Sequence, residues 1–170
     1  MVKLIFIRGA PAVGKTTITK KVLKKLKVEH NINCAYIAED DFRKQMQYKY
    51  KAKDLQAHLN SVILIKMVVL KLLELDNYDS IFIEGQFRYK EVLDEYETFV
   101  AENKFGSLYL KFNLDLDEMK KRDVELRNTK SMDIVDVKKD IDNYHPENLI
   151  FVETDKPIDE SVEVVISKII

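Results

Sequence analysis

The strongest constraint on the fold is a short segment close to the start of the chain. Residues 9–16 read Gly-Ala-Pro-Ala-Val-Gly-Lys-Thr, which fits the phosphate-binding pattern G-x-x-x-x-G-K-[ST]. An apolar run, Lys3–Ile7, precedes this segment, and a helical pattern follows it from Lys15 onward. The chain has only four glycines, and two of them stand at the spacing that the pattern requires. A strand, a tight loop and a helix in this order predict a nucleotide-binding α/β protein.

Each residue type in this loop has a chemical reason. Gly9 and Gly14 allow the backbone to wrap closely around a polyphosphate, and the amides that follow supply positive potential at a helix start. Lys15 is expected to reach the β- and γ-phosphates, and the hydroxyl of Thr16 to bind Mg²⁺. We therefore expect ATP and Mg²⁺ as cofactors. The predicted nucleotide-binding residues are Gly9, Ala10, Pro11, Ala12, Val13, Gly14, Lys15, Thr16 and Thr17.

Strand and helix patterns alternate along the whole chain. Strands are predicted at Lys3–Ile7, Cys34–Ala38, Ser80–Ile83, Ser107–Phe112 and Leu149–Val152. Helices are predicted at Lys15–Val28, Asp54–Leu75, Tyr89–Asn103, Asp115–Arg127, Ile134–Asn143 and Ile158–Lys168. This alternation predicts a three-layer α/β sandwich with parallel strands. The helix Asp54–Leu75 is apolar nearly all round, which predicts a central buried helix, with a dimer face as the alternative.

Length and composition bound the class of protein. The chain has 170 residues, 46% of them hydrophobic, which predicts one domain over residues 1–170. The single cysteine, Cys34, cannot form an intramolecular disulfide and indicates a reducing compartment. The first apolar run is too short for a signal peptide, and Lys66 and Lys71 interrupt the longest one. We expect a cytoplasmic protein without a membrane span, either a monomer or a homodimer.

Charge is distributed unevenly, although the net charge is only -1. Residues 1–53 hold 13 Lys and Arg against 4 Asp and Glu, and the remainder of the chain is acidic. The basic end is expected to gather phosphates. The alternative is that the lysines between residues 20 and 27 only solvate one helix face.

The predicted second strand ends in Glu39-Asp-Asp-Phe-Arg43. A carboxylate at this tip, beside the phosphate loop, is well placed to accept a proton from an attacking hydroxyl. Arg43, which follows these carboxylates, can hold the acceptor or its phosphate. The alternative is an Asp that caps a helix beside a solvated neighbour.

Further polar residues follow the third and fourth strands. Glu84 ends the third strand, where P-loop proteins often hold Mg²⁺ through water, and Gln86 and Arg88 are candidates for an acceptor pocket. The alternative for these two is an ordinary loop. Arg122 and Arg127 are candidates to close over the transferring phosphoryl group, or else are surface arginines paired with neighbouring carboxylates.

The segment from Arg43 to Lys53 interleaves basic residues with Tyr48 and Tyr50. Such a mixture is typical of grooves that stack the bases of single strands, and also of an ordinary amphipathic helix end. Nucleic acid is therefore a possible partner, although the sequence pI of about 6.3 is low for a nucleic-acid-binding protein.

The phosphate loop, the tetrad Asp40-Asp-Phe-Arg43 and the arginines Arg122 and Arg127 together resemble the P-loop kinase-like group. This group includes polynucleotide 5′-hydroxyl kinases, zeta-toxin kinases and chloramphenicol phosphotransferase. The resemblance covers about residues 1–145. It implies a five-stranded sheet in the order 2-3-1-4-5, a helical lid at about residues 116–145, a general base at Asp40 and an acceptor contact at Arg43. The sequence departs from polynucleotide kinases at Glu84-Gly85-Gln86, where they tend to have Asp followed by Thr or Asn.

We accordingly expect an ATP- and Mg²⁺-dependent kinase that transfers the γ-phosphate to a hydroxyl acceptor. The favoured acceptor is a polynucleotide 5′-hydroxyl or a nucleoside-like hydroxyl, with a metabolite or an antibiotic as the alternative. The alternative from another class is a non-catalytic nucleotide-binding switch.

Overall fold

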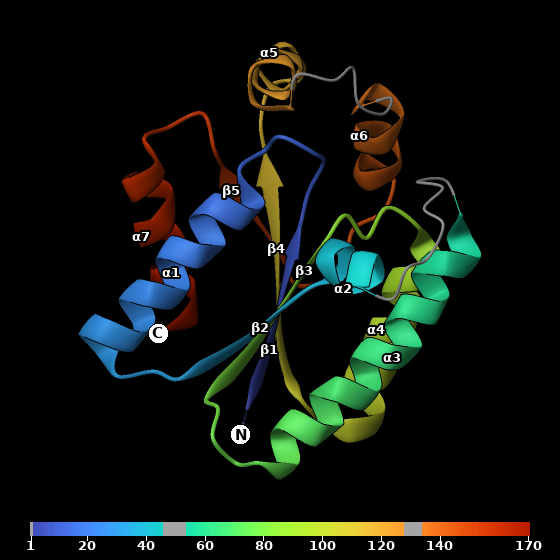
Figure 1. Cartoon of the computed structure of the whole chain (residues 1–170), viewed down its shortest axis with the longest axis vertical. Coiled ribbons are helices and arrows are strands. Elements are labelled where there is room, and N and C mark those ends of the chain that lie inside the picture. Colours follow the sequence, from blue (N-terminus) through green and yellow to red (C-terminus); the bar gives the residue numbers. More distant parts are fainter. Residues whose placement is uncertain (1, 46–53, 128–133) are drawn as a thin grey trace.

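A five-stranded parallel sheet forms the centre of the molecule (Figure 1). The computed structural model describes residues 2–45, 54–127 and 134–170. The strands are β1 Lys3–Arg8, β2 Cys34–Ala38, β3 Ser80–Gly85, β4 Gly106–Asn113 and β5 Leu149–Glu153. Their order is β2-β3-β1-β4-β5, with every neighbouring pair parallel, which confirms the predicted fold class and strand order.

Helices cover both faces of this sheet, as the alternating pattern predicts. They are α1 Lys15–His30, α2 Glu39–Gln45, α3 Leu55–Glu74, α4 Lys90–Asn103, α5 Leu116–Arg127, α6 Ile134–Asp142 and α7 Ile158–Ile169. The pair α1 and α7 lies on one face, and the pair α3 and α4 lies on the other (Figure 1). The sheet is therefore the middle layer of a three-layer sandwich.

The central strand β1 shows why the strand sequences are apolar without interruption. Successive side chains of a strand point to opposite faces, and both faces of this sheet are covered. Ile5 and Ile7 belong to the core under α1 and α7, whereas Leu4 and Phe6 belong to the core under α3 and α4. By the same alternation, Arg8 lies on the α3 and α4 side, at the carboxyl end of the strand.

One short helix, α2, stands where the sequence predicted only the tip of a strand. Its first turn holds Glu39, Asp40 and Asp41, and its last turn holds Arg43 and Lys44. Negative charge at a helix start and positive charge at its end both interact favourably with the helix dipole. The carboxylates after β2 are thereby carried on a helix.

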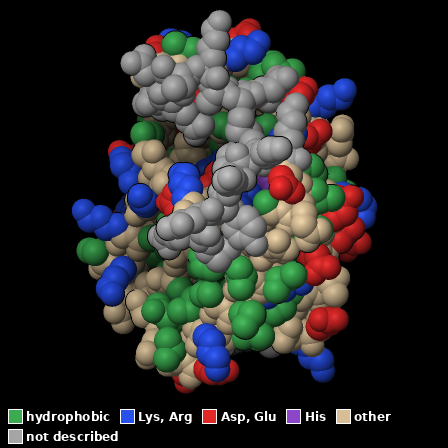
Figure 2. Space-filling view, turned by 45° about the vertical axis from the view of Figure 1, so that its right-hand side comes forward, with side chains coloured by type: hydrophobic (Ala, Val, Ile, Leu, Met, Phe, Trp, Pro, Cys, Tyr) green, Lys and Arg blue, Asp and Glu red, His purple; other side chains and the backbone are tan. Residues whose placement is uncertain are grey.

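Helix α3 is not the central buried helix that the sequence predicted. Only one of its faces packs inward, including Val62, Ile65 and Val69. On the opposite face, Ile63 is 55% exposed and Met67 is 60% exposed. Figure 2, which brings this side of the molecule forward, shows hydrophobic side chains gathered there. By length and composition alone α3 could cross a membrane, and a third of its most apolar stretch is buried in this fold.

Candidate active site

The loop between β1 and α1 has the backbone conformation that a phosphate cradle requires. Gly14, just before the first helical residue, has φ 88°, a left-handed conformation that favours glycine. Gly9 allows close packing, because a Cβ atom there would lie 2.8 Å from the carbonyl oxygen of Phe112. Both glycines of the motif are thus needed for the shape of the loop.

Lys15 begins α1 and folds back over this loop. Its Nζ donates hydrogen bonds of 2.9 Å to the carbonyl oxygens of Gly9 and Ala10. The ammonium group therefore lies beside the loop, where a phosphate would be held.

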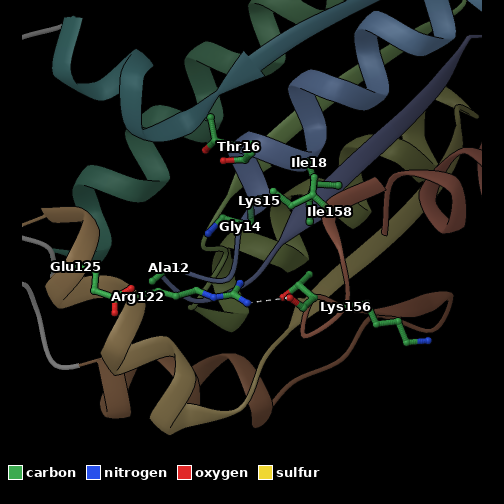
Figure 3. Close-up of a pocket in the computed structure, with 11 residues that line it drawn as sticks. Ala12, Gly14, Lys15, Thr16, Ile18, Arg122, Glu125, Lys156 and Ile158 are labelled. Carbon is green, nitrogen blue, oxygen red and sulfur yellow. Dashed lines mark hydrogen bonds between the residues drawn. The ribbon is translucent and has the colours of Figure 1, made fainter. Parts of the chain in front are cut away.

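A cavity of about 590 Å³ opens beside the start of α1. This volume is within the usual range for small-molecule sites. Its walls come from the phosphate loop, from α5 through Arg122 and Glu125, and from the segment between β5 and α7 (Figure 3). Thr154 and Lys156 are the residues of that segment that line the cavity.

Arg122 spans this cavity from α5. Its Nη2 donates to the carbonyl oxygen of Thr154 over 3.3 Å (Figure 3). Its Nε donates to Oε1 of Glu118 over 3.1 Å. The guanidinium thus lies at this cavity, and its contact with a transferring phosphoryl group stays a prediction. Arg127 ends α5, but its side chain lies outside the described residues, as do Tyr48 and Tyr50.

The predicted magnesium ligands lie in contact with each other. The Thr16 hydroxyl donates to Oε1 of Glu84 over 2.5 Å, and the hydroxyl of Tyr36 donates to Oε2 over 2.8 Å. Burial, followed by the charge of Glu84, raises the pKa of Tyr36 far above its ordinary value, so this hydroxyl remains a donor. Sequence reasoning missed Tyr36, because its relation to Glu84 depends on the pairing of β2 with β3.

A buried network surrounds Asp40. Arg43, on the same helix, is only 1% exposed and contacts the Asp40 carboxylate through Nη2. Its Nη1 lies 2.6 Å from Nδ1 of His58 and 3.3 Å from Oε1 of Glu39. Nδ1 of His58 is also 2.9 Å from Oε1 of Glu39. Arg43 therefore orients Asp40 in this structure, and its direct contact with an acceptor stays a prediction.

Sequence reasoning assigned no role to Glu39 or His58. The contact of His58 with α2 depends on how α3 packs. A signal was available in the sequence: one histidine stands in a helix that is otherwise strongly apolar. Both side chains are completely or almost completely buried, at 0% and 1% exposure.

The turn from β3 into α4 explains the departure from the polynucleotide kinase pattern. A Cβ atom at Gly85 would lie 2.4 Å from Oε2 of Glu39 and 2.6 Å from the ring of Phe87. Phe87 itself has φ 45°, a left-handed conformation that is rare for a bulky residue. Glycine therefore follows Glu84 because the Glu39 carboxylate occupies the space of a side chain.

Gln86 and Arg88, the predicted acceptor residues, are not ordinary exposed loop residues. They are 5% and 6% exposed. Arg88 donates through Nε to Oδ2 of Asp140 over 3.0 Å, and its guanidinium carbon lies 5.2 Å from the ring centre of Tyr89. Tyr89 in turn packs edge-on against His58, with ring centres 5.2 Å apart, which connects Arg88 to the network around Asp40.

The basic face of α1 is partly neutralised. Nζ of Lys21 lies 2.8 Å from Oδ1 of Asp159 on α7, and Lys25 contacts Glu163 on the same helix. These pairs agree with the alternative in which such lysines belong to a solvated helix face.

The fold is shared with known kinases of low sequence identity. The APS kinase CysC of Mycobacterium tuberculosis, solved in complex with AMPPNP and APS, matches at 15% identity and TM-score 0.74, covering 99% of this chain and 97% of its own. A gluconokinase from Sinorhizobium meliloti matches at 10% identity and TM-score 0.67, covering 97% and 90%. At such identities the likeness shows the fold alone.

No curated protein matches the sequence. The family model described as "Chromatin associated protein KTI12" matches residues 2–89. That range contains the phosphate loop, α2 and the β3 end, and spans just over half of the 170 residues. The chain therefore belongs to the KTI12 family and has the fold of the P-loop kinases.

Proposed function

We propose that this chain is an ATP- and Mg²⁺-dependent phosphotransferase that moves the γ-phosphoryl group of ATP to a hydroxyl group of an acceptor. The observation that carries the proposal is the arrangement around Asp40. The Asp40 carboxylate is 45% exposed, and its Oδ1 is held by Nη2 of the buried Arg43. A protein that only binds a nucleotide has no need of an oriented, accessible carboxylate at the carboxyl end of β2.

The residues of the loop fit a nucleotide with its metal ion. Main-chain amides of residues 9–16 and Nζ of Lys15 would hold the phosphate oxygens, in the place where Lys15 now contacts two carbonyls. Thr16 and Glu84 would hold the metal ion, Glu84 through water. When bound, Mg²⁺ neutralises charge on the phosphate oxygens.

In the proposed reaction Asp40 accepts the proton of the acceptor hydroxyl at a carboxylate oxygen as that hydroxyl attacks the γ-phosphorus. Arg43, Glu39 and His58 hold the carboxylate in place. Arg122 and Arg127 are proposed to neutralise negative charge that develops on the transferring group, as part of a lid over residues 116–145. Most of the catalysis would be positioning and electrostatics.

For the acceptor we favour a polynucleotide 5′-hydroxyl or a nucleoside-like hydroxyl. The excess of Lys and Arg in residues 1–53 supports this choice, as does the description of the family as chromatin-associated. A small-molecule acceptor is the second candidate, because structural neighbours are named as kinases of gluconate and of APS.

The two acceptor classes differ in their response to salt. Binding of a polynucleotide releases counterions, so its affinity should fall steeply with salt concentration, whereas that of a neutral small acceptor should not. Transfer of labelled γ-phosphate to 5′-hydroxyl oligonucleotides, nucleosides and pooled small alcohols, repeated at several salt concentrations, separates them. Transfer to none of these acceptors, with ATP hydrolysis retained, would favour a nucleotide switch.

The decisive variant is Asp40→Asn, which keeps the size of the side chain and removes the base. Transfer should fall by about 10²- to 10⁴-fold, with nucleotide affinity retained. Asp41→Asn is the matched control, since Asp41 is the adjacent carboxylate, is 63% exposed and pairs only with Lys44 among the described contacts. Equal effects of the two substitutions would remove Asp40 from the mechanism.

A further inference from the structure

Three buried cations meet near the carboxyl ends of the strands, on the α3 and α4 side of the sheet. Arg8 ends β1, Lys111 lies in β4, and Arg88 lies in the turn after β3, and none is more than 6% exposed. The register pairs Arg8 with Lys111. Nε of Arg8 also donates to the carbonyl oxygen of Phe87, the residue before Arg88, over 3.0 Å. The three charges therefore form one group.

The carboxylates bonded to this group come from α6, and they are fewer than the cations. Arg88 contacts Asp140, and Nζ of Lys111 donates to Oδ1 of Asp142 over 2.5 Å. Arg8 bonds only to carbonyl oxygens, those of Phe87 and Tyr144, in the described part of the chain. Burial lowers the pKa of Arg8 to about 10, which still leaves it charged at neutral pH.

The excess positive charge of this group affects a neighbouring histidine. The pKa of His145 is lowered by burial and then by the charges of Lys111 and Arg8. The neighbouring carboxylates, in contrast, are open to solvent: the side chains of Asp140 and Asp142 are 38% and 39% exposed. The cations are thus buried, and the two carboxylates that contact them from α6 are the groups that reach solvent.

Two guanidinium nitrogens of this group are buried without an acceptor. Nη2 of Arg8 and Nη1 of Arg88 have no hydrogen-bond partner among the described residues, and neither has Oε1 of Gln86. Asp140 accepts from Nε and Nη2 of Arg88 with the same oxygen, Oδ2, and Nη1 of Arg88 takes no part in this pair. A buried donor without an acceptor costs free energy, and an anion with several oxygens would satisfy it.

We propose that Arg88 is the anion-binding residue of the acceptor site, and that Asp140 occupies the place of an anionic group which the acceptor carries beside its hydroxyl. The proposal rests on the proposed function and narrows the acceptor to a hydroxyl compound with a phosphate or a carboxylate. Arg88 is connected to the proposed base through Tyr89, His58 and Arg43, each in contact with the next. The two ends of the acceptor would bind at the two ends of this row.

The test uses inorganic phosphate as the probe, and the full chain saturated with AMPPNP and Mg²⁺ so that the phosphate loop is filled. Calorimetric titration at low ionic strength gives the affinity. Asp140→Asn should bind phosphate about tenfold more tightly than the unsubstituted chain, because it no longer competes for Arg88. Arg88→Gln in the Asp140→Asn background should abolish the gain, and Arg88→Lys should restore part of it.

Glu95→Gln is the control, since it removes a half-exposed carboxylate from another ion pair, with Lys66, between α3 and α4. It should leave phosphate affinity unchanged. Parallel titrations with acetate distinguish a phosphate from a carboxylate as the preferred anion.

An affinity in Asp140→Asn equal to that of the unsubstituted chain would overturn the proposal, and so would a gain that survives Arg88→Gln. Circular dichroism of each variant verifies that it is folded. Phosphate binding at Arg88 without transfer to any alcohol would reject the phosphotransferase and retain the anion site. Transfer to acceptors at rates that Arg88→Gln does not change would reject the anion site as part of the acceptor site and retain the phosphotransferase.

Discussion

The hydroxyl of Thr16, at the start of α1, donates a hydrogen bond of 2.5 Å to Oε1 of Glu84, at the end of β3. This bond joins the phosphate loop to the neighbouring strand of the sheet. The other oxygen of Glu84 accepts from Tyr36 on β2, so the carboxylate is held from two elements. A carboxylate oriented in this way is prepared to face a metal ion beside the Thr16 hydroxyl.

Glu84→Gln should weaken the binding of the metal ion and leave the binding of the nucleotide itself unchanged. The substitution removes a negative charge and keeps the size of the side chain. The Mg²⁺ concentration that half-saturates metal-dependent nucleotide binding should rise about tenfold. Tyr36→Phe removes one hydrogen bond and leaves the charge, so its effect should be smaller. Fluorescent-nucleotide titrations with and without Mg²⁺ measure both, and equal Mg²⁺ dependence in Glu84→Gln and the unsubstituted chain would contradict the assignment.

Gly85→Ala should destabilise the fold. The added Cβ would lie 2.4 Å from Oε2 of Glu39 and would displace a carboxylate that has no exposed surface. The expected loss is about 1–3 kcal/mol in the free energy of unfolding, measured by urea denaturation. Gly106→Ala is the control, because the nearest atom to its Cβ would be 3.9 Å away on a lysine side chain. Similar losses in both variants would mean that the Glu39 contact is unimportant.

Arg122→Ala should lower kcat by about 10²-fold if the guanidinium neutralises charge that develops on the transferring group. The affinity for AMPPNP should change much less, because that interaction strengthens only in the transition state. Lys121→Ala, in the adjacent exposed position of α5, should leave both quantities unchanged. A large loss of AMPPNP affinity with kcat retained would identify Arg122 as a ground-state nucleotide ligand instead.

Asp142→Asn should make the free energy of unfolding less dependent on pH in the acidic range. Burial raises the pKa of Asp142, but hydrogen bonds and charges from Lys111 and Lys138 outweigh burial and leave that pKa below its ordinary value. The carboxylate therefore stabilises the fold above the unfolded pKa of about 3.9, and this contribution is lost as pH falls through the folded value.

At pH 7 the Asn variant should be less stable by about 1 kcal/mol, a figure reduced for the solvent exposure of Asp142. The difference should begin to fade below about pH 4, where the unfolded carboxyl binds a proton, and should be lost as pH falls through the lower folded pKa. Thermal unfolding followed by circular dichroism between pH 3 and pH 7 tests this. A difference that stays constant over the range would show that the charge of Asp142 has no part in it.

The sequence predicts the sheet and the phosphate loop well, for a physical reason. Both depend on local information: strand runs that are buried on two faces, a glycine at a left-handed position, and a lysine that follows it. The predicted strands match the observed ones to within two residues at every end. The strand order came from a resemblance that the phosphate loop anchors, and it is confirmed.

The acceptor side could not be predicted to the same depth. The partners of Asp40 include His58, and the partner of Arg88 is Asp140, each pair brought together only by tertiary packing. The burial of α3 was predicted wrongly because an apolar composition all round does not reveal how many faces have a partner. Ile63 and Met67 are apolar and exposed, and only the packed structure distinguishes them from Val62 and Val69.

The position of β1 at the centre of the sheet also determines when the phosphate loop can form during synthesis. Its two neighbours, β3 and β4, end at Gly85 and Asn113, so β1 has both partners only after residue 113 has been made. Nascent chains shorter than this present residues 9–16 without the strand support that shapes them. Nucleotide would accordingly bind only after β4 has been made, and its binding would then stabilise the folded part of the chain.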